Sequence, residues 1–427
     1  MDLTVEGKIF VNGFFESACF GIEDGKIKSV KKILKSDNHL SFKNKIILPA
    51  GVDIHVHFRE PGFTNKEDIK TGSLAALFGG VSCVFDMPNT KPQTVSIKTL
   101  NDKISRFKKS SYVDYGLYAG IADNNIDNIF SLSKRCNGFK IYLGSSTNSL
   151  LLSKKNLRKA MQAVSKTGKI VLFHAEDEEL LKKNKTVEKG LIDHVKNRPS
   201  ECEEKSIKEI FQASKDVNVK SHICHLSSIE GLELIKNRSS NISCGVTPHH
   251  SLLDFENIHG SPGFYKVNPP IRSSFDRESL FNSLKKGVVD ILESDHAPHT
   301  KDEKNNDFDS IPSGVSGVET MYPLFLYLAK KDIISFQRVI SAMCKRPAEL
   351  LGLSKGCLAK GFDADFIVVD FKNIDRIKSS DLHSKCGWSP FEDWPVLFPE
   401  SVFIRGEKLI DKNEIQVNQG FGRFVGA

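Results

Sequence analysis

The sequence predicts an α/β fold, a (β/α)₈ barrel of the TIM type with a small β-sandwich domain formed by both chain ends. Strand-like and helix-like segments alternate from Val52 to about residue 295, and β-rich segments flank this region on both sides. Eight parallel strands joined by helical crossovers fit a closed barrel. A doubly wound open sheet is the alternative. We expect residues 1–50 plus 355–427 to form the sandwich and 51–354 the catalytic barrel.

The first 49 residues are predicted to form short strands joined by tight turns. The dipeptides Asn12-Gly13 and Asp24-Gly25 are typical of hairpin turns, and each lies between apolar runs. The β character returns after about residue 355, with clear strands at 365–370 and 402–406. We therefore place these late strands with the first 49 residues in one small domain.

The middle of the chain repeats a strand and then a helix. The first helix is expected to be capped by Thr64 or Asn65 and to end at Gly79-Gly80. The polar loop 301–313 is the segment most expected to be mobile. Strands are predicted from Val52 and at 81–86, 112–118, 138–143, 169–174, 219–225, 241–246 and 288–295, with helices at 65–78, 95–108, 125–135, 155–167, 203–215, 228–237 and 276–286.

Composition excludes several classes of protein. The chain has 427 residues, 39% of them hydrophobic and 26% charged, which is typical of a soluble globular protein. The net charge of +7 is spread along the chain, so nucleic-acid binding is not expected. Nine scattered Cys without CxxC pairs indicate a reducing compartment. Without a signal-peptide pattern or a long apolar run, we expect a cytoplasmic protein with no membrane partner.

The first barrel strand carries His55 and His57 in the stretch Asp53-Ile54-His55-Val56-His57. Alternation along a strand sends both imidazoles to one face and Ile54 and Val56 to the other. Two imidazoles so placed make half of a metal site, and imidazole nitrogen suits zinc and its neighbours. The alternative is a pair of core histidines satisfied by hydrogen bonds.

Three further metal-ligand side chains follow later strands. His174 ends the fifth predicted strand, His225 the sixth and Asp295 the eighth. The carboxyl ends of barrel strands meet at one face, where catalytic groups gather. A lone His at a strand end is usually structural, but the combination with the His55–His57 pair predicts a metal site. Cys224 and Cys83 alternate to the other face and are expected in the core.

Lys140 is a single charged residue in the apolar strand 138–143. It could reach out of the barrel or pair with a carboxylate. Beside two divalent cations an ammonium would be repelled. A neutral Lys can react with CO₂, and the resulting carbamate has two oxygens that can bridge two metals.

The chain resembles the dihydroorotases, cyclic amidohydrolases of the amidohydrolase superfamily, from Lys8 to about Gly422. The motifs that carry the resemblance are DIHVHFREPG at 53–62, FDMPNT at 85–90, GFKIYLGSST at 138–147, FHAED at 173–177, ICHLSS at 223–228, VNPPIR at 267–272, SDHAPH at 294–299 and SKGCLAKGFDADFIVVD at 354–370.

The resemblance implies two divalent metal ions, expected to be Zn²⁺. His55 and His57 with Asp295 would hold the first, His174 and His225 the second, and carbamylated Lys140 would bridge them. The implied reaction is reversible hydrolysis of dihydroorotate to N-carbamoyl-L-aspartate in pyrimidine biosynthesis. A hydroxide shared by the metals attacks the ring amide, and Asp295 acts as general acid and base.

Arg59, Asn89 and His299 are similar to family residues that bind the substrate carboxylate. Asn268 is similar to a family residue that contacts the substrate ring through its backbone. An Arg fork suits a carboxylate, although Arg59 could instead pair with Glu60 or Glu67. The rivals are a hydantoinase, dihydropyrimidinase or allantoinase, or an inactive homologue acting as a scaffold. A homodimer and an association with aspartate transcarbamoylase are further expectations.

Overall fold

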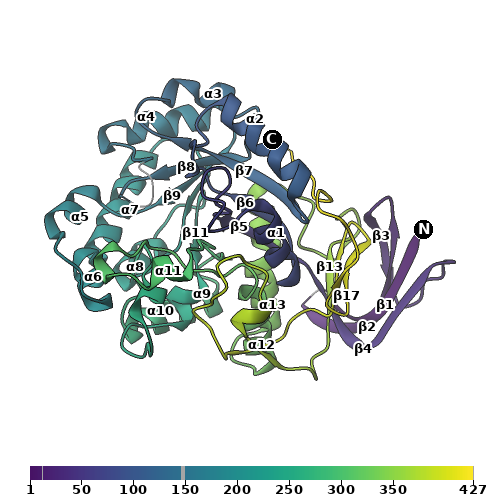
Figure 1. Ribbon diagram of the computed structural model, residues 1–427. Coiled ribbons are helices and arrows are strands. Elements are labelled where there is room, and N and C mark those ends of the chain that lie inside the picture. The colour runs from purple at the N-terminus through teal and green to yellow at the C-terminus, as the bar shows by residue number, and fades with distance from the viewer. Residues whose placement is uncertain (12, 146–149, 427) are drawn as a thin grey trace.

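The computed structural model describes residues 1–11, 13–145 and 150–426. A ring of parallel strands surrounded by helices makes up most of the chain, and a separate sheet lies beside it (Figure 1). This sheet joins strands from the N-terminus, drawn purple, to strands from the C-terminal part, drawn green to yellow (Figure 1). The predicted barrel with a small β domain from both chain ends is confirmed.

The eight barrel strands pair in parallel and in sequence order. The ring is closed by a bridge between Val56 and His296, where the His57 amide donates to the His296 carbonyl at 2.8 Å. The last strand is shorter than predicted, so Asp295 lies beyond its end. The strands are β5 Gly51–Val56, β6 Val81–Asp86, β7 Asp114–Ile121, β8 Gly138–Tyr142, β9 Ile170–His174, β10 Ser221–Ile223, β11 Ile242–Val246 and β12 Ile291–Leu292.

Helices occupy the predicted crossovers, with shifted ends. The first begins after Asp68, whose carboxylate accepts from the Thr71 amide at 2.8 Å, and not after Thr64 or Asn65. The helix expected at 125–135 shrinks to a 3₁₀ turn, Ile126–Asn128, and α3. The α-helices are α1 Ile69–Phe78, α2 Ile97–Ser110, α3 Ile129–Leu132, α4 Lys154–Ser165, α5 Glu178–Asn184, α6 Leu191–Asn197, α7 Ser200–Ser214, α8 Ile229–Lys236, α9 Pro248–Leu252, α10 Ser274–Lys286, α11 Lys301–Lys304, α12 Met321–Lys330, α13 Phe336–Ile340 and α14 Arg346–Leu351.

The small domain is one eight-stranded sheet that curls over its own core. Phe20 on β2 and Phe366 on β13 are separated in the sheet by two strands, yet their ring centroids lie 5.1 Å apart. A flat sheet would hold them about 14 Å apart, so the two halves face each other as in a sandwich. The order is β18 Glu414–Ile415, β17 Glu407–Asp411, β16 Ser401–Ile404, β13 Phe366–Val369, β4 His39–Pro49, β1 Leu3–Val11, β2 Phe14–Glu23 and β3 Lys26–Lys31.

Buried charges connect the small sheet to the barrel. The ammonium of Lys355 lies 2.7 Å from Asp114 of β7, 3.1 Å from Asp363 and 2.7 Å from Asp365. One cation therefore compensates carboxylates from both parts of the chain. The last described residues leave the small sheet and run along β7, where Phe424 bridges to Tyr115.

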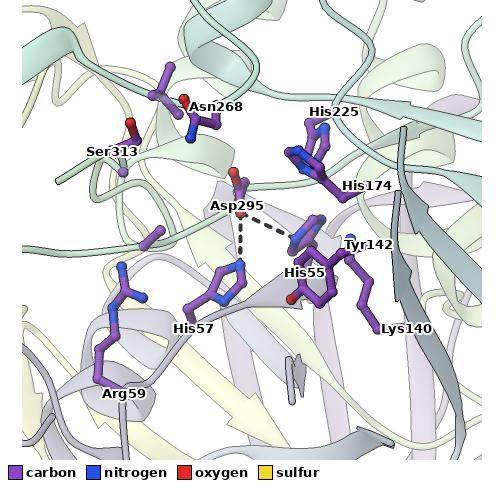
Figure 2. A pocket seen from close by; sticks show the side chains of 13 residues that line it. His55, His57, Arg59, Lys140, Tyr142, His174, His225, Asn268, Asp295 and Ser313 are labelled. Atoms are coloured by element: carbon purple, nitrogen blue, oxygen red, sulfur yellow. Dashed lines mark hydrogen bonds and ion pairs between the residues drawn. The ribbon is translucent and has the colours of Figure 1, made fainter. Parts of the chain in front are cut away.

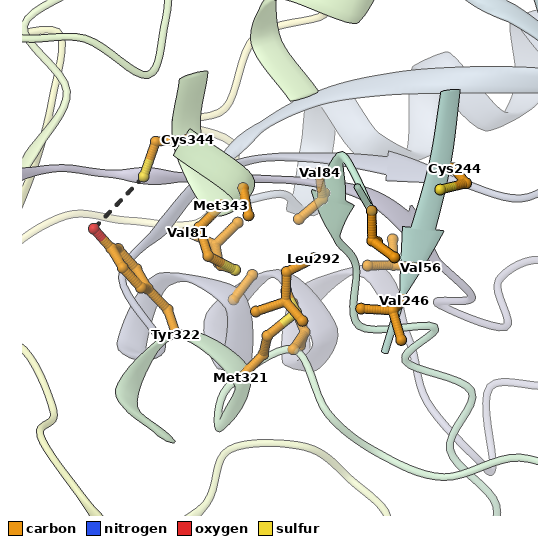
Figure 3. Packing of buried hydrophobic residues seen from close by; sticks show 14 of the residues in the cluster. Val56, Val81, Val84, Cys244, Val246, Leu292, Met321, Tyr322, Met343 and Cys344 are labelled. Carbon is orange, nitrogen blue, oxygen red and sulfur yellow. Dashed lines mark hydrogen bonds between the residues drawn. The ribbon is translucent and has the colours of Figure 1, made fainter. Parts of the chain in front are cut away.

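The outer face of the barrel strands packs against the helices that follow β12. Val56 and Leu292 from the strands meet Met321 from α12 and Met343 from the π-helical turn Ser341–Lys345 (Figure 3). Each such buried side chain stabilises the fold by about 1.5–3 kcal/mol. This packing fixes the strand ends from which the polar side chains of the barrel mouth project. In the described residues, no helix has the length and apolar character needed to cross a membrane.

Candidate metal and substrate site

Polar side chains from the strand ends line one narrow cavity in the barrel mouth (Figure 2). Eight of the ten site residues predicted from the sequence line it, and Asn89 and His299 lie behind its wall. The lining residues are His55, His57, Arg59, Lys140, Tyr142, His174, His225, Val267, Asn268, Asp295, Ala297, Ser313 and Gly314.

Two imidazoles converge on one carboxylate oxygen at the centre of the cavity. Oδ1 of Asp295 lies 3.0 Å from His57 Nε2 and 3.2 Å from His55 Nε2, as the dashed lines in Figure 2 show. The other ring nitrogen of His57, Nδ1, donates to Asn89 Oδ1 at 2.7 Å. Asn89 therefore fixes the tautomer in which His57 Nε2 faces Asp295 with a lone pair.

The simple alternation predicted for the first strand is wrong at its end. The pairing register of β5 shifts between Asp53 and Val56, as in a β-bulge. Ile54 therefore joins the interior cluster of the barrel with Val52, although His55 also faces inward. The rings of His55 and His57 still lie together, with centroids 5.3 Å apart.

His174 and His225 form the second pair of ligand candidates. His174 Nδ1 lies 3.1 Å from His225 Nε2. His174 Nε2 donates to Glu176 Oε2 at 2.8 Å, and Arg198 Nε donates to the same carboxylate group, at Oε1, at 3.1 Å. Glu176 therefore orients His174 so that Nδ1 offers its lone pair to the cavity.

Left-handed backbone conformations turn three of these side chains into the cavity. Arg59, His225 and Asp295 have φ values of 61°, 37° and 43°. Such values are uncommon for residues other than Gly, and they gather at functional sites when the surroundings hold them in place. Each lies two or three residues beyond the end of a barrel strand, where the chain no longer follows strand alternation.

The donor set fits divalent metal ions. The Nε2 atoms of His55 and His57 both lie within 3.2 Å of one oxygen of Asp295. A neutral imidazole has one N–H group, and that of His57 is on Nδ1, where it donates to Asn89. His57 Nε2 could therefore donate to Asp295 only if the ring became an imidazolium. Burial lowers the pKa of His55 to about 4, so its ring is neutral. His55, His225 and Asp295 offer one ligand atom each within 4.8 Å of one another. A divalent cation would satisfy these facing lone pairs.

Burial favours neutral imidazoles, and the neighbouring histidines favour an ionised Asp295. Burial lowers the pKa of His174 and takes that of His225 well below its usual range. Burial also raises the pKa of Asp295, but His55 and His57 beside it outweigh this effect and hold it well below its usual range. These are the protonation states that metal ligands need.

Lys140 is completely buried and faces the cavity from β8. Its Nζ donates to Cys224 Sγ at 3.1 Å, and within the described ranges no carboxylate lies at ion-pair distance from it. Lys140 therefore neither reaches solvent nor pairs with a described carboxylate, which were the two structural alternatives for this residue. Cys224 is buried in the core as predicted. It is not on the opposite face, however, because β10 ends at Ile223 and the chain then turns.

The guanidinium of Arg59 lies at the end of the cavity opposite His174, His225 and Lys140 (Figure 2). Its Nε donates to the Pro298 carbonyl at 3.1 Å, and Nη2 lies 3.1 Å from His299 Nε2. The predicted alternative of an ion pair with Glu60 or Glu67 is not found. His299 itself is enclosed by Lys66, whose Nζ is 3.2 Å from Nδ1, so it braces Arg59 from behind.

The polar loop expected to be mobile is anchored at the cavity rim. Lys304 of α11 is completely buried, and its Nζ donates to the Lys266 and Pro312 carbonyls at 3.1 and 2.9 Å. Lys66 and Glu303 form an ion pair of 2.6 Å beside it. These contacts hold Ser313 at the cavity wall.

Sequence reasoning missed three residues. Glu176 lies two residues after His174, and Glu293 two residues before Asp295, where its Oε2 is 3.5 Å from His55 Nδ1. Tyr142 lies two residues after Lys140 and lines the cavity. For Tyr142 the period of two along β8 was the available signal, because it places this residue on the face of Lys140. Glu176 and Glu293 lie outside the strands, so no strand period marked them.

The profile of the Amidohydrolase family matches residues 46–408, which is most of the chain, and the chain belongs to this family. Members of the family generally bind divalent metal ions, in agreement with the donor set described above. The class that the fold and the cavity define is therefore a metal-dependent amidohydrolase.

Within the family, similar curated proteins include dihydroorotases. That of Thermoplasma volcanium is 39% identical over 426 residues, covering 100% of this chain and 98% of the relative. That of Methanosarcina acetivorans is 36% identical over 438 residues, covering 98% and 94%.

Solved structures with the same fold include hydantoinases. The L-hydantoinase (dihydropyrimidinase) of Arthrobacter aurescens superposes with a TM-score of 0.95 at 26% identity, covering 100% of both chains. The dihydropyrimidinase of Brevibacillus agri gives a TM-score of 0.90 at 22% identity, over 100% and 98% of the two chains, and shows the fold alone.

Proposed function

We propose that this chain hydrolyses (S)-dihydroorotate reversibly to N-carbamoyl-L-aspartate, the dihydroorotase reaction of pyrimidine biosynthesis. The observation that carries the proposal is Arg59, a buried cation in the same cavity as the ligand candidates. A ring amide placed at the imidazoles leaves a ring carboxylate free to meet this guanidinium. Relatives named dihydroorotase, aligned over nearly the full length, support the same substrate.

We propose two zinc ions for the cavity. His55, His57 and Asp295 would hold one, His174 and His225 the other, and a carbamate on Lys140 would bridge them. When bound, the ions lower the pKa of a water molecule and polarise the amide carbonyl. Without a carbamate the five other ligands carry one formal negative charge. Lys140 is buried and has no ion pair with any described residue, which supports its modification.

Asp295 is proposed as the general acid and base. In ring opening, water adds to the ring amide carbon, the carbon–nitrogen bond breaks, and a proton must travel from the water to the leaving nitrogen. Asp295 is ionised, because its histidine neighbours hold its pKa well below the usual range. It can therefore accept the proton from water and return it to the nitrogen. Ring closure uses the same steps in reverse.

Arg59 is proposed to bind the substrate carboxylate, braced by His299. Burial, with help from Arg59, lowers the pKa of His299 to about 3, so its ring stays neutral beside the guanidinium. Asn89 supports the site through His57, and Asn268 offers its backbone to the substrate ring. The neutral ring of His299 leaves the charge of Arg59 available for the ligand.

A hydantoinase is the second candidate, because the fold of the Arthrobacter aurescens enzyme superposes over the entire chain. The decisive assay follows ring opening of L-dihydroorotate, hydantoin, dihydrouracil and allantoin by zinc-loaded protein. We expect the largest kcat/KM for dihydroorotate. A larger value for another ring would select the corresponding amidohydrolase, and no turnover by protein with two bound ions would indicate a scaffold.

We further propose a homodimer that associates with aspartate transcarbamoylase, on the resemblance to dihydroorotases alone. Light scattering of the chain with and without that enzyme measures both assemblies. A monomeric mass in both samples would contradict them.

A further inference from the structure

Tyr142 ends β8 and presents its phenol to the cavity. It lies two residues after Lys140 on the same face of the strand, and its side chain is almost completely buried. Its Oη is buried and has no hydrogen-bond partner among the residues that the structure describes. Proteins rarely leave a buried hydroxyl unpaired, because the group loses its hydrogen bonds to water without replacement. An unpaired hydroxyl on the wall of a ligand cavity therefore indicates that the ligand supplies the partner.

The two ends of the Tyr142 side chain face different surroundings. The Nζ of Lys140 lies 5.3 Å from the centroid of the ring, over its face. Figure 2 shows the hydroxyl end turned away from Lys140, toward the side of the cavity where His57 and Arg59 lie. The hydroxyl is thus directed to the end of the cavity where Arg59 would bind the substrate carboxylate.

The phenol shares the cavity with Asp295 and Arg59, which line it as well. A phenol is neutral at pH 7 and can donate one hydrogen bond.

We infer that Tyr142 is a specificity-determining residue whose hydroxyl donates a hydrogen bond to the substrate carboxylate held by Arg59. The inference rests on the proposed function, since it needs a ring that carries a carboxylate. A carboxylate has four lone-pair positions, so it can accept from Arg59 and from Tyr142 together. A ring without the carboxylate would leave the phenol unpaired, and the site discriminates against it for that reason.

Tyr142→Phe removes only the hydroxyl and keeps the ring against Lys140. Tyr118→Phe is the matched control. Tyr118 on β7 is also completely buried, and its Oη has no partner within residues 1–11, 13–145 and 150–426, but it does not line the cavity. Both variants are loaded with zinc, and metal content and melting temperature are measured first. Turnover of dihydroorotate and dihydrouracil is then compared, together with inhibition by orotate, which keeps the carboxylate.

We expect Tyr142→Phe to lower kcat/KM for dihydroorotate roughly 10- to 100-fold, the effect of losing a hydrogen bond to a charged group. The inhibition constant of orotate should rise by a similar factor, while turnover of dihydrouracil and metal content stay unchanged. Tyr118→Phe should match the wild type. Equal losses on both substrates, no loss on either, or loss of metal would overturn the inference. If the wild type fails to open dihydroorotate, the proposed function fails instead.

Discussion

Replacing Arg59 by Met tests how the site selects its substrate. The guanidinium has five N–H groups. One donates to the Pro298 carbonyl and one points at His299. The other three have no partner among the described residues and remain for a ligand. Met has a similar length without the charge. The variant therefore removes the carboxylate partner and keeps most of the apolar volume.

The expected loss follows from the number of hydrogen bonds. A bond to a charged group contributes about 1.5–3 kcal/mol, and a bidentate pair of such bonds therefore about 3–6 kcal/mol. This corresponds to a fall in kcat/KM for dihydroorotate of about 10²- to 10⁴-fold. Dihydrouracil has no carboxylate, so its turnover should change little. The Pro298 carbonyl also loses a donor, which should lower the free energy of unfolding by about 1–2 kcal/mol.

The assay measures kcat/KM on both substrates for zinc-loaded protein, with the urea midpoint as a check on folding. Arg158→Met is the control, because Arg158 is exposed on α4 and donates to the backbone carbonyl of Lys215 far from the cavity. The reasoning is refuted by equal losses on both substrates, which would show that Arg59 supports the fold or the metals and not the carboxylate.

Three further results are expected. Lys140→Ala should lose the second ion first and nearly all activity, with partial rescue by a short carboxylic acid; two tightly held ions by metal analysis, with a near-normal rate, would eliminate the bridging role. Asp295→Asn should abolish turnover in both directions while retaining most of the metal, and substantial activity at any pH from 6 to 9 would contradict its role as acid and base. Finally, the metal-free protein should lose stability as pH falls from about 6.5 to 4, because burial lowers the pKa of His250 to about 4 and that of His299 to about 3. Below pH 6.5 the unfolded chain binds more protons at both residues than the folded chain does. Each residue therefore lowers the free energy of unfolding by about 1.4 kcal/mol per pH unit. A urea midpoint unchanged between pH 7 and pH 5 would refute this.

The sequence predicted the barrel because its signals are local. Apolar runs and helix caps depend on neighbours along the chain, and they located all eight strands. The strand ends were predicted less accurately: β12 has two residues where eight were expected. Strand pairing at the barrel's closure depends on His296 and Val56, which are far apart in sequence. No local pattern marks such a contact.

The sequence by itself determined the set of candidate ligands. His55 and His57 lie on the first predicted strand, and His174, His225 and Asp295 end later ones, whose carboxyl ends meet in a barrel. Only the tertiary structure decided how their atoms face each other. The bulge in β5 and the left-handed turns at His225 and Asp295 break strand alternation. The turn at His225 allows both Cys224 and His225 to face the interior. The tertiary structure also revealed that the Tyr142 hydroxyl has no partner among the described residues, because the partners of a buried polar group depend on every element packed around it.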